Sequence, residues 1–270
     1  MFSLIKSGMA TAMHELSVVS NNIANANSNG FKKTLVAFTE LGNRFSTEQV
    51  ERSQAGQGAL LTASRRSDGQ GSIIQTDTKT DLAVNGNGFF IIKNPQTVTP
   101  VFTRNGTFNL DEAGYLRDPS NAFLLGAPLI DGDFAAVPTD IDSLQPIQIP
   151  LKKEDVPMSD LIIEPDGKIR ASYGTDLSYP ISTLALGIFS NNTGLKELGG
   201  GGYSRTDRSG VLSFGAPQDL GFGSLISGGL EASNVNITDE LTSMIKAQQQ
   251  FNGSARLMQA NSEMVQKLTE

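Results

Sequence analysis

The hydrophobic periodicity of this chain changes twice along its length, and that pattern limits the folds open to it. Near the start, apolar or small residues alternate at spacings of four and three, at Ile5, Met9, Ala12, Leu16, Val19, Ile23 and Ala26. The same spacing returns near the end, at Ile237, Leu241, Met244, Gln248, Phe251, Ala255, Met258, Ser262 and Val265, widened by Ile245 and Leu268. This spacing is the heptad seam of a helix that packs along another helix. A helix is therefore predicted at each end.

Local signals set the limits of these helices. Gly30 is a natural stop for the first one, because glycine accepts the left-handed conformation at little steric cost. The second is expected from about Thr238 to Lys267, with Asn236 or Thr238 as the cap and acidic residues in the first turn. Gly253 costs about 1 kcal/mol relative to alanine inside a helix, so we expect some softening there.

Between the ends the pattern is one of short strands and turns. Residues 81–84 and 89–92 flank Asn85-Gly86-Asn87-Gly88, a hairpin signal. Further runs at 101–103, 107–110, 115–117, 161–163, 168–173 and 184–189 are separated by turn residues such as Asp166-Gly167. Strands at this spacing, without helical patterns between them, indicate an antiparallel sandwich or barrel.

The predicted fold class is therefore α+β. Residues 1–34 and 234–270 should form a terminal helical domain whose two helices pair as a coiled-coil-like core. Residues 35–80 should be an extended linker, and residues 81–233 a central all-β domain. Within the linker, residues 51–71 have the polar composition of a mobile loop, and Gly199-Gly200-Gly201-Gly202 is flexible by composition.

The amino-acid composition excludes most of the familiar classes of enzyme active site. The chain has no cysteine, and its one histidine, His14, lies in the first predicted helix, so thiolate zinc sites, disulfides and cysteine nucleophiles are excluded. No nucleophile-elbow sequence accompanies His14, and no glycine-rich segment leads into a lysine-serine or lysine-threonine pair. The aspartates of the middle segment fit solvated turns. We expect no catalytic residue, no metal and no cofactor.

Charge and hydropathy also bear on partners. The formal charge is −7, which gives no basis for binding a nucleic-acid backbone. No apolar run reaches the roughly 18 residues needed to span a bilayer, so membrane insertion is not expected. The first residues lack the continuous apolar stretch of a cleaved signal peptide.

Two interpretations of the terminal heptads remain open at this point. The helices could pack on each other inside a single copy, as an ordinary helical hairpin. They could also bury their stripes against copies of the same protein, which the small and medium residues of the seams would suit.

A resemblance adds weight to the second interpretation. Residues 18–33, Val-Val-Ser-Asn-Asn-Ile-Ala-Asn-Ala-Asn-Ser-Asn-Gly-Phe-Lys-Lys, closely resemble the N-terminal signature of bacterial flagellar rod and hook proteins. Residues 227–235, Ser-Gly-Gly-Leu-Glu-Ala-Ser-Asn-Val, are similar to the segment that opens the C-terminal helix of that family. Asp81-Leu82-Ala83-Val84, Gly88-Phe89-Phe90 and Thr103-Arg104-Asn105-Gly106 resemble its central strands.

The resemblance implies a structural subunit of the flagellar axis, exported without a cleaved signal through the flagellar export apparatus. It implies assembly with its own copies and with other axial proteins into a helical tube, in the basal-body rod that spans the periplasm. The residues that would make assembly contacts are Leu16, Val19, Asn21, Asn22, Ile23, Asn25, Asn29, Leu230, Ser233, Asn234, Leu241, Met244, Ile245, Phe251 and Met258.

Two alternatives stay open. The length of 270 residues favours a rod subunit, whereas Phe123-Leu124-Leu125-Gly126-Ala127-Pro128 and Asn191-Asn192-Thr193-Gly194-Leu195 resemble the hook pattern of a protein with a reduced outer domain. A soluble binding protein built on the β-domain is the rival outside the family, but the sequence nominates no binding site for it.

Overall fold

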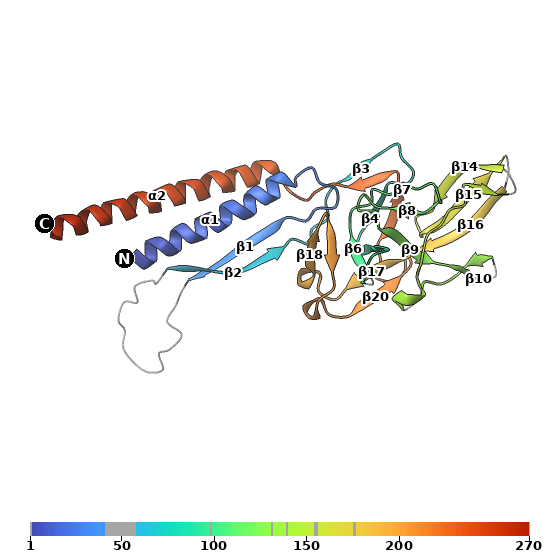
Figure 1. Cartoon of the computed structure of the whole chain (residues 1–270), viewed down its shortest axis with the longest axis horizontal. Coiled ribbons are helices and arrows are strands. Elements are labelled where there is room, and N and C mark those ends of the chain that lie inside the picture. The colour runs from blue at the N-terminus through green and yellow to red at the C-terminus, as the bar shows by residue number, and fades with distance from the viewer. Residues whose placement is uncertain are drawn as a thin grey trace. The chain divides into compact units, whose positions relative to one another are not determined.

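The computed structural model describes residues 2–40, 58–97, 99–130, 132–138, 140–153, 156–174 and 177–269. Backbone contacts divide the chain into two compact units (Figure 1). The terminal unit consists of Met1–Ala26, Lys32–Ser67 and Val235–Glu270, and the central unit of Asn27–Phe31 and Asp68–Asn234. Both ends of the chain thus belong to the same unit, although more than 200 positions of sequence separate them.

The terminal unit contains both long helices, and they pack side by side (Figure 1). Helix α1 spans Phe2–Ala24 and helix α2 spans Ile237–Thr269. The predicted cap of α2 is confirmed, because the Asn236 side-chain oxygen accepts a hydrogen bond from the Thr238 N–H at 3.0 Å. Helix α1 ends earlier than the Gly30 stop, since the amide of Ala26 already bonds back only three residues, to the Ile23 carbonyl.

A two-stranded hairpin completes the terminal unit. Strand β1, Thr34–Glu40, pairs antiparallel with β2, Ala59–Arg66, and both strands contact α1. These strands lie inside the segment 35–80, for which the sequence suggested an extended linker. Of the expected loop at 51–71, residues 51–57 lie outside the described part of the chain, and β2 begins two residues later.

The central unit is β-rich, and the strand pairs among its described residues are antiparallel. Its largest sheet has 14 strands, with the main order β13-β14-β15-β16-β9-β5-β6-β19-β18. The strands are β3 (Ile73–Gln75), β4 (Leu82–Asn85), β5 (Phe89–Lys93), β6 (Val101–Thr103), β7 (Asn109–Leu110), β8 (Leu116–Arg117), β9 (Phe123–Ala127), β10 (Leu129–Ile130), β11 (Asp133–Phe134), β12 (Gln145–Pro146), β13 (Lys152–Lys153), β14 (Val156–Ile163), β15 (Lys168–Tyr173), β16 (Leu177–Leu184), β17 (Leu186–Phe189), β18 (Lys196–Gly199), β19 (Gly202–Ser204), β20 (Leu212–Gly215), β21 (Ser224–Ser227) and β22 (Gly229–Glu231). Short 3-10 helices lie at η1 (Ile141–Ser143), η2 (Asn192–Gly194) and η3 (Asp207–Ser209).

The expected pairings hold in part. Strands β14 and β15 form the hairpin predicted around Asp166-Gly167, and β7 pairs with β8 as a hairpin. The hairpin predicted for 81–84 and 89–92 is wrong: β4 pairs with β21, and β5 pairs with β6, β9 and β17. The four glycines at 199–202 form the tight turn between β18 and β19.

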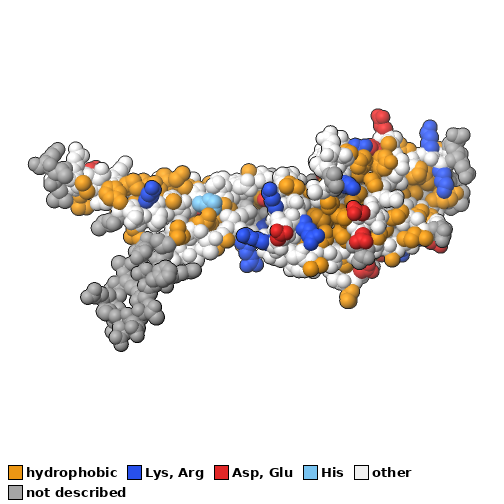
Figure 2. Space-filling view, turned by 60° about the horizontal axis from the view of Figure 1, so that its bottom comes forward, with side chains coloured by type: hydrophobic (Ala, Val, Ile, Leu, Met, Phe, Trp, Pro, Cys, Tyr) orange, Lys and Arg blue, Asp and Glu red, His pale blue; other side chains and the backbone are white. Residues whose placement is uncertain are grey.

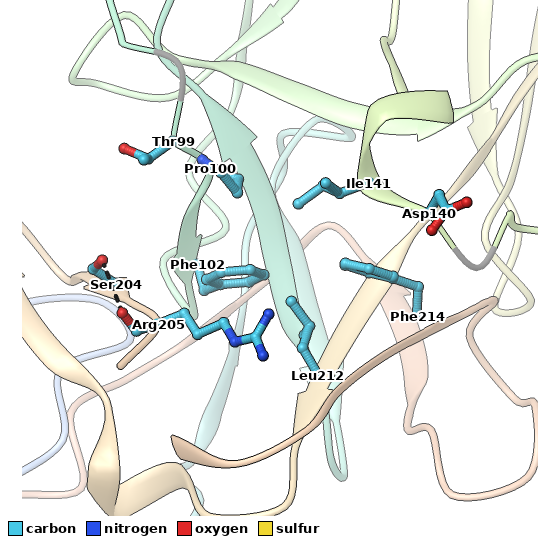
Figure 3. Close-up of a pocket in the computed structure, with 9 residues that line it drawn as sticks. All are labelled: Thr99, Pro100, Phe102, Asp140, Ile141, Ser204, Arg205, Leu212 and Phe214. Carbon is cyan, nitrogen blue, oxygen red and sulfur yellow. Dashed lines mark hydrogen bonds between the residues drawn. The ribbon is translucent and has the colours of Figure 1, made fainter. Parts of the chain in front are cut away.

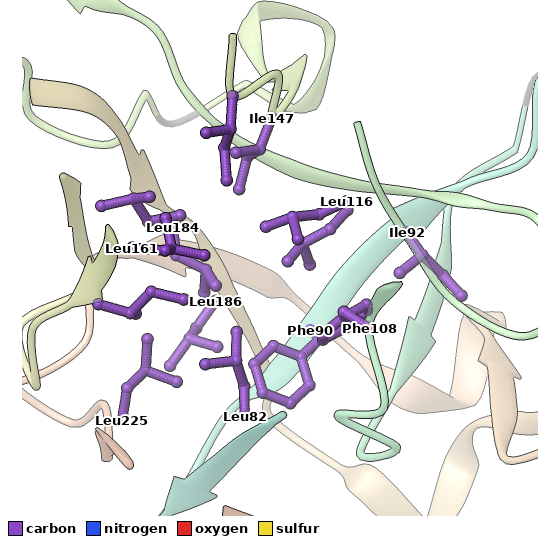
Figure 4. Packing of buried hydrophobic residues seen from close by; sticks show 14 of the residues in the cluster. Leu82, Phe90, Ile92, Phe108, Leu116, Ile147, Leu161, Leu184, Leu186 and Leu225 are labelled. Atoms are coloured by element: carbon purple, nitrogen blue, oxygen red, sulfur yellow. The ribbon is translucent and has the colours of Figure 1, made fainter. Parts of the chain in front are cut away.

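Strand β5 shows why that hairpin does not form. Phe90 and Ile92 face one hydrophobic cluster, whereas Phe89 and Ile91 face a second (Figure 4 shows part of the first). A strand that is apolar on both faces is stable only in the interior of a sheet, with a neighbour on each edge. The two clusters, one on each face of β5, together form the hydrophobic core of the central unit.

Three chain segments meet next to this core. The Gly30 N–H donates to the Glu231 carbonyl at 2.7 Å, and the Gly71 N–H donates to the Glu231 carboxylate at 3.0 Å. The same carboxylate lies 3.2 Å from Nη1 of Arg104, and both side chains are buried. Burial lowers the pKa of Arg104, and the charge of Glu231 opposes that shift. The pair therefore ties residues 30, 71 and 231 to one point of the central unit.

Candidate assembly surface

The inner face of α2 is a heptad seam of small and medium side chains. Its buried or half-buried positions recur every three or four residues, at Glu240, Ser243, Met244, Ala247, Phe251, Ser254, Ala255, Met258 and Asn261. The two helices approach closely where Gly8 of α1 lies next to Ser254, since a Cβ on Gly8 would stand 3.6 Å from the serine hydroxyl. Small residues at such points let two helix backbones pack closely.

On α1 the inner face follows the predicted seam. Ala12 and Val19 are buried, and Ile5, Leu16 and Ile23 are half-buried. On α2 the observed face matches the predicted seam in part. Met244, Phe251, Ala255 and Met258 belong to both, whereas Leu241 and Gln248 are exposed. The most apolar stripe of α2 is therefore not the stripe that the chain covers by itself.

A polar cluster joins α1, α2 and β1. Asn22 is only 1% exposed, and its side-chain amide donates to the Thr34 carbonyl at 2.9 Å and to Glu240 Oε2 at 3.1 Å. Its side-chain oxygen accepts from the Thr34 N–H at 2.9 Å. The ammonium of Lys33 lies 3.8 Å from the other oxygen of Glu240. In this conformation the Asn22 amide bonds inside its own chain and is not accessible to a second copy.

The outer face of α2 leaves large apolar side chains in solvent. They follow each other at spacings of four along one side of the helix, at Ile237, Leu241 and Ile245, which are 45%, 45% and 54% exposed. We call these three residues the outer stripe. Exposed apolar side chains also occur at Leu257, Met264 and Val265, but at 3.6 residues per turn they lie on other sides of the helix. Hydrophobic side chains also gather over the helical part of the molecule in Figure 2. Exposed Phe2, Leu4 and Met13 of α1 add to the apolar surface of the terminal unit.

The remaining candidate residues fall into two groups. Asn21 is exposed, and the side chain of Asn25 donates back to the Asn21 carbonyl at 2.9 Å, which extends the end of α1. Asn29, Leu230, Ser233 and Asn234 belong to the central unit. There the amide of Asn29 donates to the Thr107 hydroxyl at 3.3 Å, Leu230 pairs with Ile74, and Asn234 donates to the Gly69 carbonyl.

Several residues of this region were missed from the sequence. Lys33, Thr34 and Glu240 complete the Asn22 cluster, yet none of them lies on a heptad position predicted as a contact. Glu240 was noted only as an acidic residue of the first turn. The one sequence signal for this cluster was the place of Glu240 four residues before the seam residue Met244, which puts its carboxylate on the inner face of α2.

Catalytic chemistry finds no support in the described residues. Among them, no group of three or more His, Asp or Glu side chains is close enough to hold a metal ion. His14 contacts the Ser64 hydroxyl at 3.4 Å, a distance typical of a weak surface contact. Neither helix, over its described residues, is long and apolar enough to cross a membrane.

Comparison with known proteins accounts for both units. Residues 6–32 match a family model described as flagella basal body rod protein, and residues 83–171 match one described as flagellar hook protein FlgE/F/G D1 domain. Residues 226–270 match the flagellar basal body rod FlgEFG protein C-terminal model. A flagellar basal-body rod protein FlgG of Buchnera aphidicola from Acyrthosiphon pisum is 31% identical over 98% of this chain and 96% of its own length. The chain belongs to the flagellar rod and hook protein family.

Other members of the flagellar rod and hook protein family agree with this. The basal-body rod protein FlgG of Bacillus subtilis is 30% identical over 97% of this chain and 95% of its own length. The hook protein FlgE of Helicobacter pylori is 34% identical, but over only 51% of this chain and 21% of its own length. The matches that run from end to end are thus to rod proteins. The chain is a structural subunit of the flagellar axis and not an enzyme.

Proposed function

We propose that this chain builds the flagellar basal-body rod by burying its outer stripe against sister copies. Residues 1–34 and 234–270 act as the assembly domain, in which α1 and α2 form a coiled-coil-like pair. Copies related by a repeated screw operation then form a helical tube, because a head-to-tail contact that does not close on itself extends without limit.

The observation that carries this proposal is the outer stripe. Three large apolar side chains on one side of α2 remain about half exposed after the helix has packed against α1. Burying the exposed half of each would contribute about 1 kcal/mol, at roughly 25 cal/mol per Å² of apolar area. A row of such residues on a rigid helix is a usual mark of a protein interface.

The candidate contacts divide accordingly. Leu241 and Ile245 are the central contacts between copies, and Met244, Phe251 and Met258 hold α2 on α1 and contribute their exposed edges. Leu16, Val19 and Ile23 serve the helix pair. Asn21 is an exposed polar contact, whereas Asn29, Leu230, Ser233 and Asn234 support assembly by fixing the segments that lead into the helices.

The partners that we propose are further copies of this chain, the other axial proteins above and below it, and the export apparatus. Export would proceed without cleavage of a signal peptide, so the exported protein should keep the mass of the intact chain. The matches to rod proteins along the full length favour the rod over the hook.

A double variant tests the outer stripe. Leu241→Glu with Ile245→Glu should weaken self-association at least roughly tenfold, since two apolar contacts are lost and two charges would be buried. Sedimentation velocity over a range of concentrations measures that association. A matched control, Thr242→Glu with Gln249→Glu, adds the same charge to exposed polar positions of the same helix that lie outside the outer stripe. Equal association of the two double variants, with unchanged thermal melting, would reject the proposal.

A further inference from the structure

One turn of the central unit carries a leucine whose side chain is completely exposed to solvent. Leu220 is fully exposed, with a relative exposure of 103%, the highest value among the exposed large apolar side chains of the described residues. It lies at the tip of the turn between β20 and β21. The Asp219 carboxylate accepts the Ala216 N–H at 2.9 Å, and the Phe222 N–H donates to the Asp219 carbonyl at 2.9 Å. The tip is therefore a hydrogen-bonded turn.

Both ends of this turn are fixed on the central unit. Pro217 is buried against Gly167, where a Cβ would stand only 2.6 Å from the proline ring. After the tip, the Gly223 N–H donates to the Asn87 carbonyl at 2.7 Å. Leu220 is thus held out in solvent by an anchored turn and can be buried at little further cost in conformational entropy.

A pocket of about 470 Å³ in the same unit offers an apolar receptor. Phe102, Leu212, Phe214, Ile141 and Pro100 supply its apolar surface, and Figure 3 shows their side chains around a common space. Its polar lining includes Arg205 and Asp140, which lie on opposite sides of it in Figure 3. An apolar floor with a few charged groups at the margin is typical of a binding pocket.

The turn and the pocket lie on opposite faces of β20. Successive residues of a strand point to opposite sides of the sheet. Leu212 and Phe214 line the pocket, whereas a Cβ on Gly215 would meet the ring of Phe222, which belongs to the turn. Phe222 packs against the first hydrophobic cluster, and Leu212 and Phe214 pack against the second. The turn is thus anchored on the face away from the pocket of its own copy.

We propose that Leu220 of one copy inserts into this pocket of a second copy. The pocket charges favour one orientation of this occupant, in which Asp219, the residue before the leucine, faces Arg205 and lies away from Asp140 on the opposite side. The inference rests on the proposed self-assembly and adds to it a contact between central units. Since the two halves of the contact lie on different faces, each copy offers one of each, and the contacts extend into an open array.

Cysteine pairing tests the geometry directly, because the natural chain has no cysteine. The variant Leu220→Cys with Ser204→Cys places one thiol on the turn and one at the pocket. Mild oxidation should yield a ladder of linked oligomers that collapses on reduction, because a disulfide forms only when two Cβ atoms come within about 4.5 Å. A matched control, Leu220→Cys with Leu198→Cys, moves the second thiol to an exposed strand residue outside the pocket and should yield no ladder. A ladder from the control alone, or from neither variant, overturns the proposal.

Substitutions test the energetics on the full chain. Leu220→Ala should weaken self-association roughly tenfold, since it removes most of the buried side chain. Leu198→Ala, at an exposed strand residue outside the pocket, should leave association unchanged. Arg205→Glu should weaken association, and Arg208→Glu, the same charge change at an exposed residue that does not line the pocket, should not.

The outcomes separate the two proposals. If the wild-type chain associates and Leu220→Ala associates equally well, the pocket contact is wrong and assembly through the helices stands. If the wild-type chain does not associate and the Leu220→Cys, Ser204→Cys variant gives no ladder, both proposals are wrong. Thermal melting of each variant shows that the central unit has kept its fold.

Discussion

The side-chain amide of Asn22 donates a hydrogen bond to the carboxylate of Glu240, 3.1 Å away and 218 positions later in the chain. The two residues belong to α1 and α2, and both side chains are buried. Asn22 also bonds the backbone of Thr34 in β1. One asparagine therefore connects three elements of the terminal unit, and its first role is to hold that unit together.

Asn22→Ala should destabilise the terminal unit by about 2 kcal/mol. The change removes three hydrogen bonds and leaves the Glu240 carboxylate buried with one partner fewer. Hydrogen exchange of the α1 amides measures the effect on the terminal unit, because the two units can unfold separately. Asn21→Ala, at an exposed position one residue earlier, is the control and should change exchange little. Equal exchange in the two variants would contradict the structural role of Asn22.

Gly253→Ala should stabilise α2 by about 1 kcal/mol. The helix runs without interruption through this position, and a Cβ there would have nothing within 4 Å. Urea denaturation followed by circular dichroism at the helical band measures the change. Gly253→Pro, in contrast, should cost about 3 kcal/mol or more, because proline removes a helical hydrogen bond. A neutral effect of both changes would mean that α2 is frayed at this point in solution.

Gly30→Ala should cost about 3 kcal/mol in the stability of the central unit. Its φ is +69°, and a Cβ would stand 2.5 Å from the Arg104 carbonyl carbon and from the Asn105 nitrogen. Gly200→Ala is the control for the backbone angle alone, since its φ is +61° and nothing lies within 4 Å of its Cβ. That change should cost only about 1–2 kcal/mol. Thermal denaturation of both variants decides whether the close approach at Gly30 matters beyond its φ.

Acid should weaken the turn at Asp111 in the central unit. Burial alone would raise the pKa of this carboxyl, but the amides of Tyr115 and Ala113 and the guanidinium of Arg117 donate to it and bring its pKa below the ordinary value. A carboxyl whose pKa is lowered by folding contributes stability above its unfolded pKa, about 3.9. That contribution is lost as the pH falls through the lower pKa of the folded state.

Asp111→Asn should therefore lower the melting temperature at pH 7 by about 2–4 °C, as for a loss of roughly 1 kcal/mol. The difference from the wild type should shrink as the pH falls below about 4, because the wild-type carboxyl then becomes neutral as well. Melting curves from pH 7 to pH 2 measure it. Glu112→Gln, at the exposed neighbouring position, should show no such dependence on pH. A constant difference at all pH values would exclude the charge of Asp111 as the cause.

The sequence predicted the elements of the terminal unit better than their contacts. Heptad spacing and the Asn236 cap placed α2 within a few residues of its observed limits. The inner face of α2 was predicted only in part, because apolar character favoured the exposed Leu241, whereas the chain itself also packs on the smaller Ala247 and Ser254. Large apolar side chains at a helix surface carry no mark that tells whether they face the same copy or another.

In the central unit, the β14–β15 hairpin was predictable from its turn, but the partners of β4 and β5 were not. The Asn85–Gly88 run has turn chemistry, yet β4 and β5 pair with strands that are distant in sequence, such as β21 and β17. Pairing of this kind depends on which two faces of a strand are apolar, and Phe89 to Ile92 are apolar on both. Likewise, the segment 35–80 was expected to be an extended linker, yet β1 and β2 pair as a hairpin beside α1, and such a hairpin needs only one modest apolar face.

The backbone passes between the two units four times, after residues 26, 31, 67 and 234, and the Arg104–Glu231 ion pair fastens three of the segments concerned within the central unit. In a rotating shaft, a twisting load on one unit would reach the other through several parallel covalent paths. No single covalent connection would carry that load alone.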